Sequence, residues 1–84
     1  MYEYYFTFYS VTQAQAAVRA LDRESIPSKM MRTPKGLQNQ GCGYSISVRS
    51  GFYIQAKDRL EGSRVPFHRV YCKFPDGSFE EVTA

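Results

Sequence analysis

The chain has 84 residues, a length that allows one domain with a modest core and leaves little volume for a deep enzyme pocket. With 43% hydrophobic and 23% charged residues it has an ordinary globular composition, which argues against disorder. The net charge is +3, and the basic residues are scattered along the chain, so an anionic partner is possible but not required. The sequence lacks a membrane-spanning apolar run and a signal-peptide start, so a cytoplasmic location is expected. Two cysteines and one histidine predict neither a disulfide framework nor a structural zinc site, and no cofactor is expected.

The start of the chain predicts a strand followed by a helix. Residues 2–9 are rich in Tyr, Phe and Thr, a composition typical of a β-strand. Ser10, with Gln13 three residues later, has the spacing of a capping box, and apolar residues then recur at helical spacing to about residue 24. Pro27 ends the helix, because a proline disfavours helical geometry in the residue before it.

The middle of the chain predicts two strands with a loop between them. Residues 28–32 predict a short strand, and residues 33–41 predict a loop because they are rich in Pro, Gly and Asn. In residues 44–49 apolar side chains alternate with serine and arginine, and this period of two is typical of a half-buried strand.

The last part of the chain predicts a helix, a strand and a short hairpin. Ser50 is a suitable cap for a helix over residues 51–61, which is followed by a glycine. Residues 67–74 predict the next strand. Residues 75–78, Pro-Asp-Gly-Ser, predict a tight turn, after which residues 79–82 can return as a short extra strand.

These elements follow in the order β-α-β-β-α-β, in a single domain spanning residues 1–84. Packing both helices on one face of a four-stranded antiparallel sheet gives an α+β, ferredoxin-like sandwich. Right-handed crossovers favour the strand order four, one, three, two. In this order the end of the first strand lies beside the start of the third, because these two strands are antiparallel neighbours.

Cys42 is the residue that this topology makes distinctive. It stands between Gly41 and Gly43, just before the third strand, and is expected near the start of the first helix. A helix N-terminus and nearby cations stabilise a thiolate, and the glycines leave room for a partner to approach. The sequence favours an accessible, nucleophilic thiol, with a turn cysteine needed only for backbone geometry as the alternative. Cys72 alternates with apolar strand residues, so it is expected in the core and too far from Cys42 for a disulfide.

Five short motifs also occur in a specific order along the chain. They are Phe8-Tyr9-Ser10-Val11-Thr12 with Ala14, Ile26-Pro27, Thr33-Pro34-Lys35, Gly41-Cys42-Gly43, and a closing strand with Tyr71. In this order the chain resembles the selenium/sulfur carrier protein-like family, small bacterial domains of unknown function, over about residues 4–73. It departs from the family at Arg32, where a proline is usual, and at Lys35, where an arginine is usual. The tail from Pro75 onward lies outside the pattern.

The resemblance implies a small non-enzymatic carrier that holds sulfur or selenium as a persulfide-type adduct on Cys42. A donor enzyme of the cysteine desulfurase type would load the thiol, and a protein acceptor would unload it. Lys35 and Arg32 would stabilise the thiolate. The residues expected around the thiol are Ser10, Thr12, Arg32, Pro34, Lys35, Gly41 and Gly43.

The uncovered face of the predicted sheet supports a second hypothesis. Its expected side chains are Tyr5, Thr7, Tyr9, Ser45, Ser47, Arg69, Tyr71 and Lys73. Basic and aromatic side chains on a sheet are typical of RNA-recognition modules, but such modules need aromatics where Ser45 and Ser47 stand, which argues against nucleic acid. The plainer alternative is a protein-interaction or regulatory domain that uses this face, for example to form a homodimer. His68 is expected at the same end of the sheet as Cys42 and is a candidate proton shuttle, although structural histidines are commoner.

Overall fold

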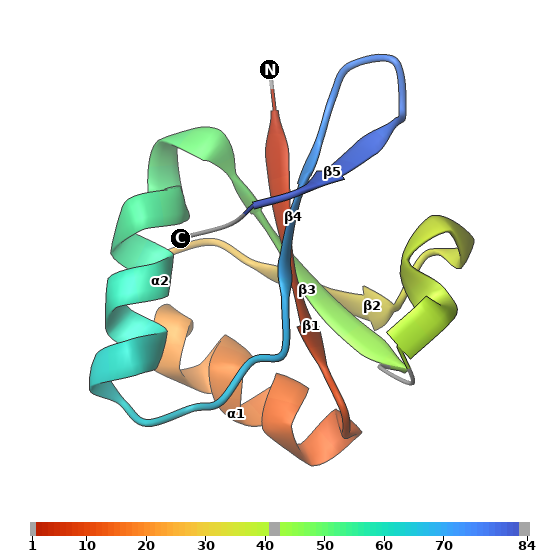
Figure 1. Ribbon diagram of the computed structural model, residues 1–84. Helices are drawn as coiled ribbons and strands as arrows, with labels where there is room; N and C mark the ends of the chain where they lie inside the picture. Colours follow the sequence, from red (N-terminus) through yellow and green to blue (C-terminus); the bar gives the residue numbers. More distant parts are fainter. Residues whose placement is uncertain (1, 41–42, 83–84) are drawn as a thin grey trace.

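The computed structural model describes residues 2–40 and 43–82 of the chain (Figure 1). Its strands and helices, in chain order, are β1 (Glu3–Phe8), α1 (Val11–Asp22), β2 (Lys29–Arg32), the 3₁₀ helix η1 (Lys35–Gln40), β3 (Tyr44–Arg49), the 3₁₀ helix η2 (Ser50–Phe52), α2 (Tyr53–Gly62), β4 (Val70–Lys73) and β5 (Phe79–Glu81). Within these described residues, neither α-helix has the length and apolar character needed to cross a membrane.

The strands form one antiparallel sheet in the order β2-β3-β1-β4-β5. The first four strands therefore have the predicted order, and β5 extends the sheet beyond β4, so that the sheet has five strands rather than four. The predicted turn at residues 75–78 makes this extension possible. Gly77 occupies the left-handed region, with φ of 90°, and its N–H donates to the Phe74 carbonyl at 2.9 Å.

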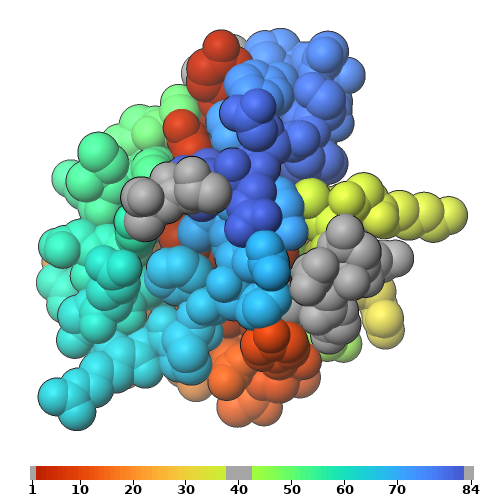
Figure 2. Space-filling model, in the orientation of Figure 1, coloured from red at the N-terminus to blue at the C-terminus, as the bar shows by residue number. Residues whose placement is uncertain are grey.

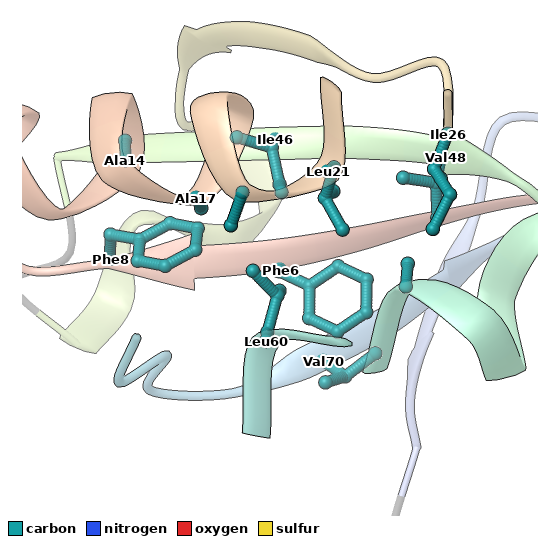
Figure 3. Close-up of a cluster of buried hydrophobic side chains, with 12 residues drawn as sticks. Phe6, Phe8, Ala14, Ala17, Leu21, Ile26, Ile46, Val48, Leu60 and Val70 are labelled. Carbon is teal, nitrogen blue, oxygen red and sulfur yellow. The ribbon is translucent and has the colours of Figure 1, made fainter. Parts of the chain in front are cut away.

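The hydrophobic core lies between the sheet and the two α-helices, which cover the same face of the sheet (Figures 1 and 3). Period-two alternation directs Phe6, Phe8, Ile46 and Val48 to this face, and Ala14, Ala17 and Leu21 of α1 pack against them. Small alanines on α1 allow that helix to approach the phenylalanines closely. Ala56 and Leu60 extend the same cluster from α2.

Two local predictions in the middle of the chain were wrong. Residues 33–41 were expected to form an irregular loop, but residues 35–40 form η1. Ser50 was expected to cap the second helix, but its side chain makes no capping hydrogen bond and η2 precedes α2. The reason is that the N–H of Ser50 donates to the Tyr2 carbonyl at 3.0 Å, so this residue continues the pairing of β3 with β1.

The second face of the sheet was expected to be open, and this expectation was also wrong for its centre. Tyr5, Thr7, Ser45 and Ser47 are all buried, although they point away from the α-helices. In Figure 1, η1 lies on the side of the sheet opposite the α-helices, and Figure 2 shows its first residues (yellow) beside the C-terminal hairpin (blue). The cover formed by η1 and the hairpin therefore buries the centre of the surface on which the RNA and sheet-face interaction hypotheses depended, while Tyr9 stays exposed and Arg69, Tyr71 and Lys73 are half-buried.

Candidate functional site

The candidate site lies at the end of the sheet where β1 ends and β3 begins. Phe8 pairs with Tyr44 there, as expected from the predicted strand order. Gly41 and Cys42 lie outside the residues that the structure describes. Gly43, the next residue, is exposed, and its carbonyl accepts a hydrogen bond from the N–H of Thr33 at 3.1 Å. Apart from its neighbours in the chain, no described residue has an atom within 4 Å of a Cβ built on Gly43, so this position is open on the described side.

The start of α1 reaches the same end of the sheet directly from β1. Ser10 is the N-cap, with extended backbone geometry, and its hydroxyl oxygen accepts a hydrogen bond from the N–H of Gln13 at 3.2 Å. This confirms Ser10 as the start signal for the helix. Thr12 lies in the first turn and is exposed. The positive end of the helix macrodipole is therefore at the end of the sheet where Gly43 lies.

The two basic residues expected to stabilise the thiolate, Arg32 and Lys35, lie in different elements of the structure. Arg32 pairs with Tyr44 in the β2–β3 ladder, and its guanidinium carbon lies 5.7 Å from the centre of the Tyr44 ring. This contact is in the range of a cation–π interaction. Lys35 instead begins η1 and is exposed. Pro34 helps to start that helix, because its carbonyl accepts a hydrogen bond from the N–H of Leu37 at 2.8 Å.

Leu37 is a residue of this region that the sequence analysis did not single out. Its side chain is only 3% exposed, so it anchors η1 on the second face of the sheet. Beneath the same cover, the hydroxyls of Thr33 and Ser45 form a buried hydrogen bond of 2.8 Å. A lone leucine between glycine and glutamine has no periodicity, and only its apolar character could have indicated burial.

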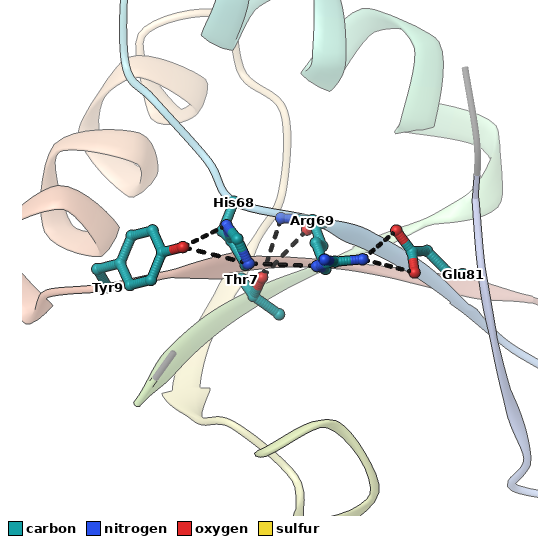
Figure 4. A network of polar contacts seen from close by, with 5 residues as sticks. All are labelled: Thr7, Tyr9, His68, Arg69 and Glu81. Carbon is teal, nitrogen blue, oxygen red and sulfur yellow. Dashed lines mark hydrogen bonds and ion pairs between the residues drawn. The ribbon is translucent and has the colours of Figure 1, made fainter. Parts of the chain in front are cut away.

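His68 takes part in a side-chain network that the sequence analysis did not predict (Figure 4). Its Nδ1 lies 2.7 Å from the hydroxyl oxygen of Tyr9, and its Nε2 accepts a hydrogen bond from Nε of Arg69 at 3.2 Å. Arg69 also donates from Nη1 to both carboxylate oxygens of Glu81, each at 2.9 Å. The network joins the end of β1 to β4 and β5, with Thr7 bonded to the Arg69 backbone.

The donors in this network determine the tautomer of the neutral imidazole. Because Arg69 can only donate, Nε2 of His68 must be the accepting nitrogen and Nδ1 carries the proton. Nδ1 then donates to the hydroxyl oxygen of Tyr9 at 2.7 Å, and Nε2 lies 3.3 Å from the same oxygen. Tyr9 is 58% exposed. The partners that the structure gives His68 fit a structural histidine.

Cys72 is buried in β4, as the sequence predicted for this cysteine. It lies opposite Tyr4 in the β1–β4 ladder, and Tyr4 stacks on Tyr53 of α2 with ring centres 4.0 Å apart. Burial raises the pKa of the Tyr4 phenol, and the neighbouring Cys72 raises it further. Cys72 is therefore part of the packing between sheet and α2 and is poorly placed to react with a partner protein.

Comparison with known families connects these observations. No curated protein and no solved structure gives a significant match to the chain. A family described as "Putative Se/S carrier protein-like" matches residues 3–72, which include β1 through most of β4. The match therefore includes all the residues expected around the thiol, while β5 and its hairpin turn lie beyond it. The chain belongs to this Se/S carrier protein-like family.

Proposed function

We propose that the protein is a non-enzymatic carrier that holds sulfur or selenium on Cys42 between a donor enzyme and an acceptor protein. The observation that carries this proposal is membership of the Se/S carrier protein-like family, because the match spans most of the chain and includes Cys42. The strand order of the first four strands, with both α-helices on one face, supports a ferredoxin-like arrangement for this carrier.

The proposed loading step is an exchange between sulfur atoms. The Cys42 thiolate attacks the outer sulfur of a persulfide on a cysteine desulfurase-type donor. One S–S bond forms on Cys42 as the S–S bond in the donor breaks, and the donor cysteine leaves as a thiolate. The step has no net oxidation, and transfer to the acceptor repeats it with the roles exchanged.

Several described features support Cys42 as the reacting residue. The neighbouring Gly43 is exposed, and the start of α1 lies at the same end of the sheet. A helix N-terminus stabilises a thiolate and lowers the cost of forming it. Arg32, on the strand beside Gly43, and Lys35, at the start of η1, add positive charge to this region. Cys72, by contrast, is buried.

The test compares the two cysteines of the chain. The wild-type protein, Cys42→Ser and Cys72→Ala are each incubated with a cysteine desulfurase and L-cysteine and then analysed by intact-mass spectrometry. We expect the mass of one sulfur atom to be added to the wild type and to Cys72→Ala, and not to Cys42→Ser. A persulfide that maps to Cys72, or a wild-type protein that acquires no sulfur from any tested desulfurase, would contradict the proposal.

A further inference from the structure

A groove between α1 and the edge strand β2 lies outside the site described above. It has a volume of about 330 Å³ and is lined by Gln15, Val18 and Arg19 of α1 and by Met30 of β2. Val18 and Met30 make its floor apolar. Met30 is 37% exposed, which is a large exposure for an apolar side chain in a sheet.

The groove runs beside backbone that can pair with another strand. β2 is the end strand of the described sheet and pairs only with β3. In an antiparallel ladder the backbone groups of alternate residues point away from the paired strand. The N–H of Thr33 points toward β3, where it bonds Gly43, so the N–H and carbonyl groups of Met30 and Arg32 point outward. An extended segment from another protein can add to such an edge.

The charges around this edge are mostly positive. Lys29 and Arg32 lie at the two ends of β2, and Arg19 lines the groove from α1. Among the described residues the ion pairs are Arg59–Glu24 and Arg69–Glu81, so none of these three cations is neutralised by an ion pair there. The acidic residue of α1, Asp22, lies at its C-terminal end, beyond Arg19.

We propose that the β2 edge and its groove bind an extended acidic segment of a partner protein, which adds to the sheet beside β2. On the α1 side, an apolar side chain of the segment would lie on Val18 and Met30 and a carboxylate would meet Arg19 and Arg32. On the other side of the sheet a carboxylate would meet Lys29. A second copy of this chain is a poorer occupant, because pairing β2 with β2 would bring these cations together. The proposal shares Arg32 with the region around Cys42 but needs no thiol, so the variant Cys42→Ser separates it from the carrier function.

The test uses a fluorescein-labelled peptide with the repeat Val-Val-Glu-Glu, which places both residue types on each face of a strand. The peptide is about ten residues long, a length that covers a short strand with overhang. Binding is followed by fluorescence anisotropy. We expect saturable binding that weakens as salt is added, because the contacts are exposed ion pairs. Arg19→Glu and Arg32→Glu should each weaken binding by about fivefold or more, since each replaces an attraction by a repulsion. Cys42→Ser should bind as the wild type does.

Controls separate this site from general charge attraction. Arg64→Glu makes the same charge change on an exposed residue beyond α2 and should leave binding nearly unchanged. A peptide with N-methyl groups at alternate residues should bind weakly, because it cannot pair with the strand edge. Three results would overturn the proposal: no binding of the peptide, an equal loss with Arg64→Glu, or amide shift changes in ¹⁵N spectra that lie away from residues 15–19 and 29–32.

Discussion

The two faces of the sheet are covered in different ways. On one face, α1 and α2 bury an almost entirely apolar layer, in which Phe6 and Phe8 are fully buried. On the other, η1 and the C-terminal hairpin cover a mixture of serine, threonine and tyrosine side chains. There, Phe79 of β5 packs edge-on against Tyr5 with ring centres 5.3 Å apart, and one of its ring carbons lies 3.6 Å from a Cβ built on Gly36 of η1.

This difference indicates separate tasks for the two layers. Apolar burial is the dominant stabilising force of a small domain, so the helix-covered face should supply most of the folding free energy. The second face buries fewer large apolar side chains, and its cover η1 leads directly into the residues around Cys42. Its packing should hold the segment before Cys42 in place while contributing less to global stability.

The largest expected effect is therefore on the helix-covered face. Phe6→Ala removes a fully buried ring that contacts Phe67 and Tyr53, with ring centres 5.1 and 5.9 Å away. We expect a loss of about 3–5 kcal/mol in the free energy of unfolding, because a cavity adds to the lost transfer energy. Urea unfolding followed by circular dichroism measures this. A loss below about 1 kcal/mol would show that this layer is not the main source of stability.

A matched pair of leucines compares the two faces directly. Leu60 of α2 is fully buried on the helix-covered face, and Leu37 of η1 is 3% exposed on the second face. We expect Leu60→Ala to cost about 3 kcal/mol and Leu37→Ala about 2 kcal/mol, because the short η1 can settle into the space that its own leucine leaves. Urea unfolding of both variants gives the two values.

Hydrogen exchange then separates local from global effects in the same pair. Leu37→Ala should speed amide exchange in η1 well beyond its effect on α1, since local opening of η1 does not require the core to unfold. Leu60→Ala should speed exchange in both regions. If Leu37→Ala destabilises the protein as much as Leu60→Ala and loosens α1 equally, the two faces form one cooperative layer and the distinction fails.

The smallest effect concerns the turn that brings Phe79 to the second face. The Asp76 carboxylate accepts hydrogen bonds from the hydroxyl and the N–H of Ser78, at 2.6 and 2.9 Å. These bonds lower the pKa of Asp76 below its ordinary value of 3.8. The folded protein therefore binds this proton less readily than the unfolded chain. The stabilisation that these hydrogen bonds give the folded protein is complete at pH values above the ordinary pKa, and it is lost as the pH falls through the lowered pKa.

An acid titration tests this prediction. Between about pH 6 and pH 2 the ring signals of Tyr5 and Phe79 in NMR spectra should shift toward those of an open hairpin before the core signals of Phe6 change. Asp76→Asn is the control, because its side chain keeps an acceptor oxygen without titrating, and its hairpin signals should be nearly independent of pH. A wild-type hairpin that titrates just as Asp76→Asn does would show that other carboxyl groups control it.

Residue patterns were sufficient to predict most of the architecture. The Tyr-, Phe- and Thr-rich strand β1, the period-two strand β3, the Ser10 cap and the turn at residues 75–78 all formed as expected, because each is determined by residues close in sequence. The strand order followed from the handedness of the crossovers. The family was also recognisable from short motifs, and the family match confirms it.

The candidate site was only partly predictable. Ser10, Arg32 and Gly43 were correctly expected at one end of the sheet, since strand register alone brings them there. Cys42 lies outside the described residues, so its place beside them stays a prediction. The contact between Tyr9 and His68 depends on how side chains from distant strands turn at the sheet end, which no local pattern encodes.

The sequence by itself determined most of the secondary structure, the order of the first four strands and the family, because these depend on local propensity, periodicity and chain handedness. Only the tertiary structure decided what covers the second face of the sheet. Leu37 and Phe79 stand in short segments without periodicity. Leu37 is buried and Phe79 is half-buried because η1 and β5 meet over the second face, where Phe79 packs on Tyr5 and lies beside Gly36. Whether a sheet face is covered or exposed thus depends on contacts between residues distant in sequence, and the alternation of side chains within its own strands does not show it.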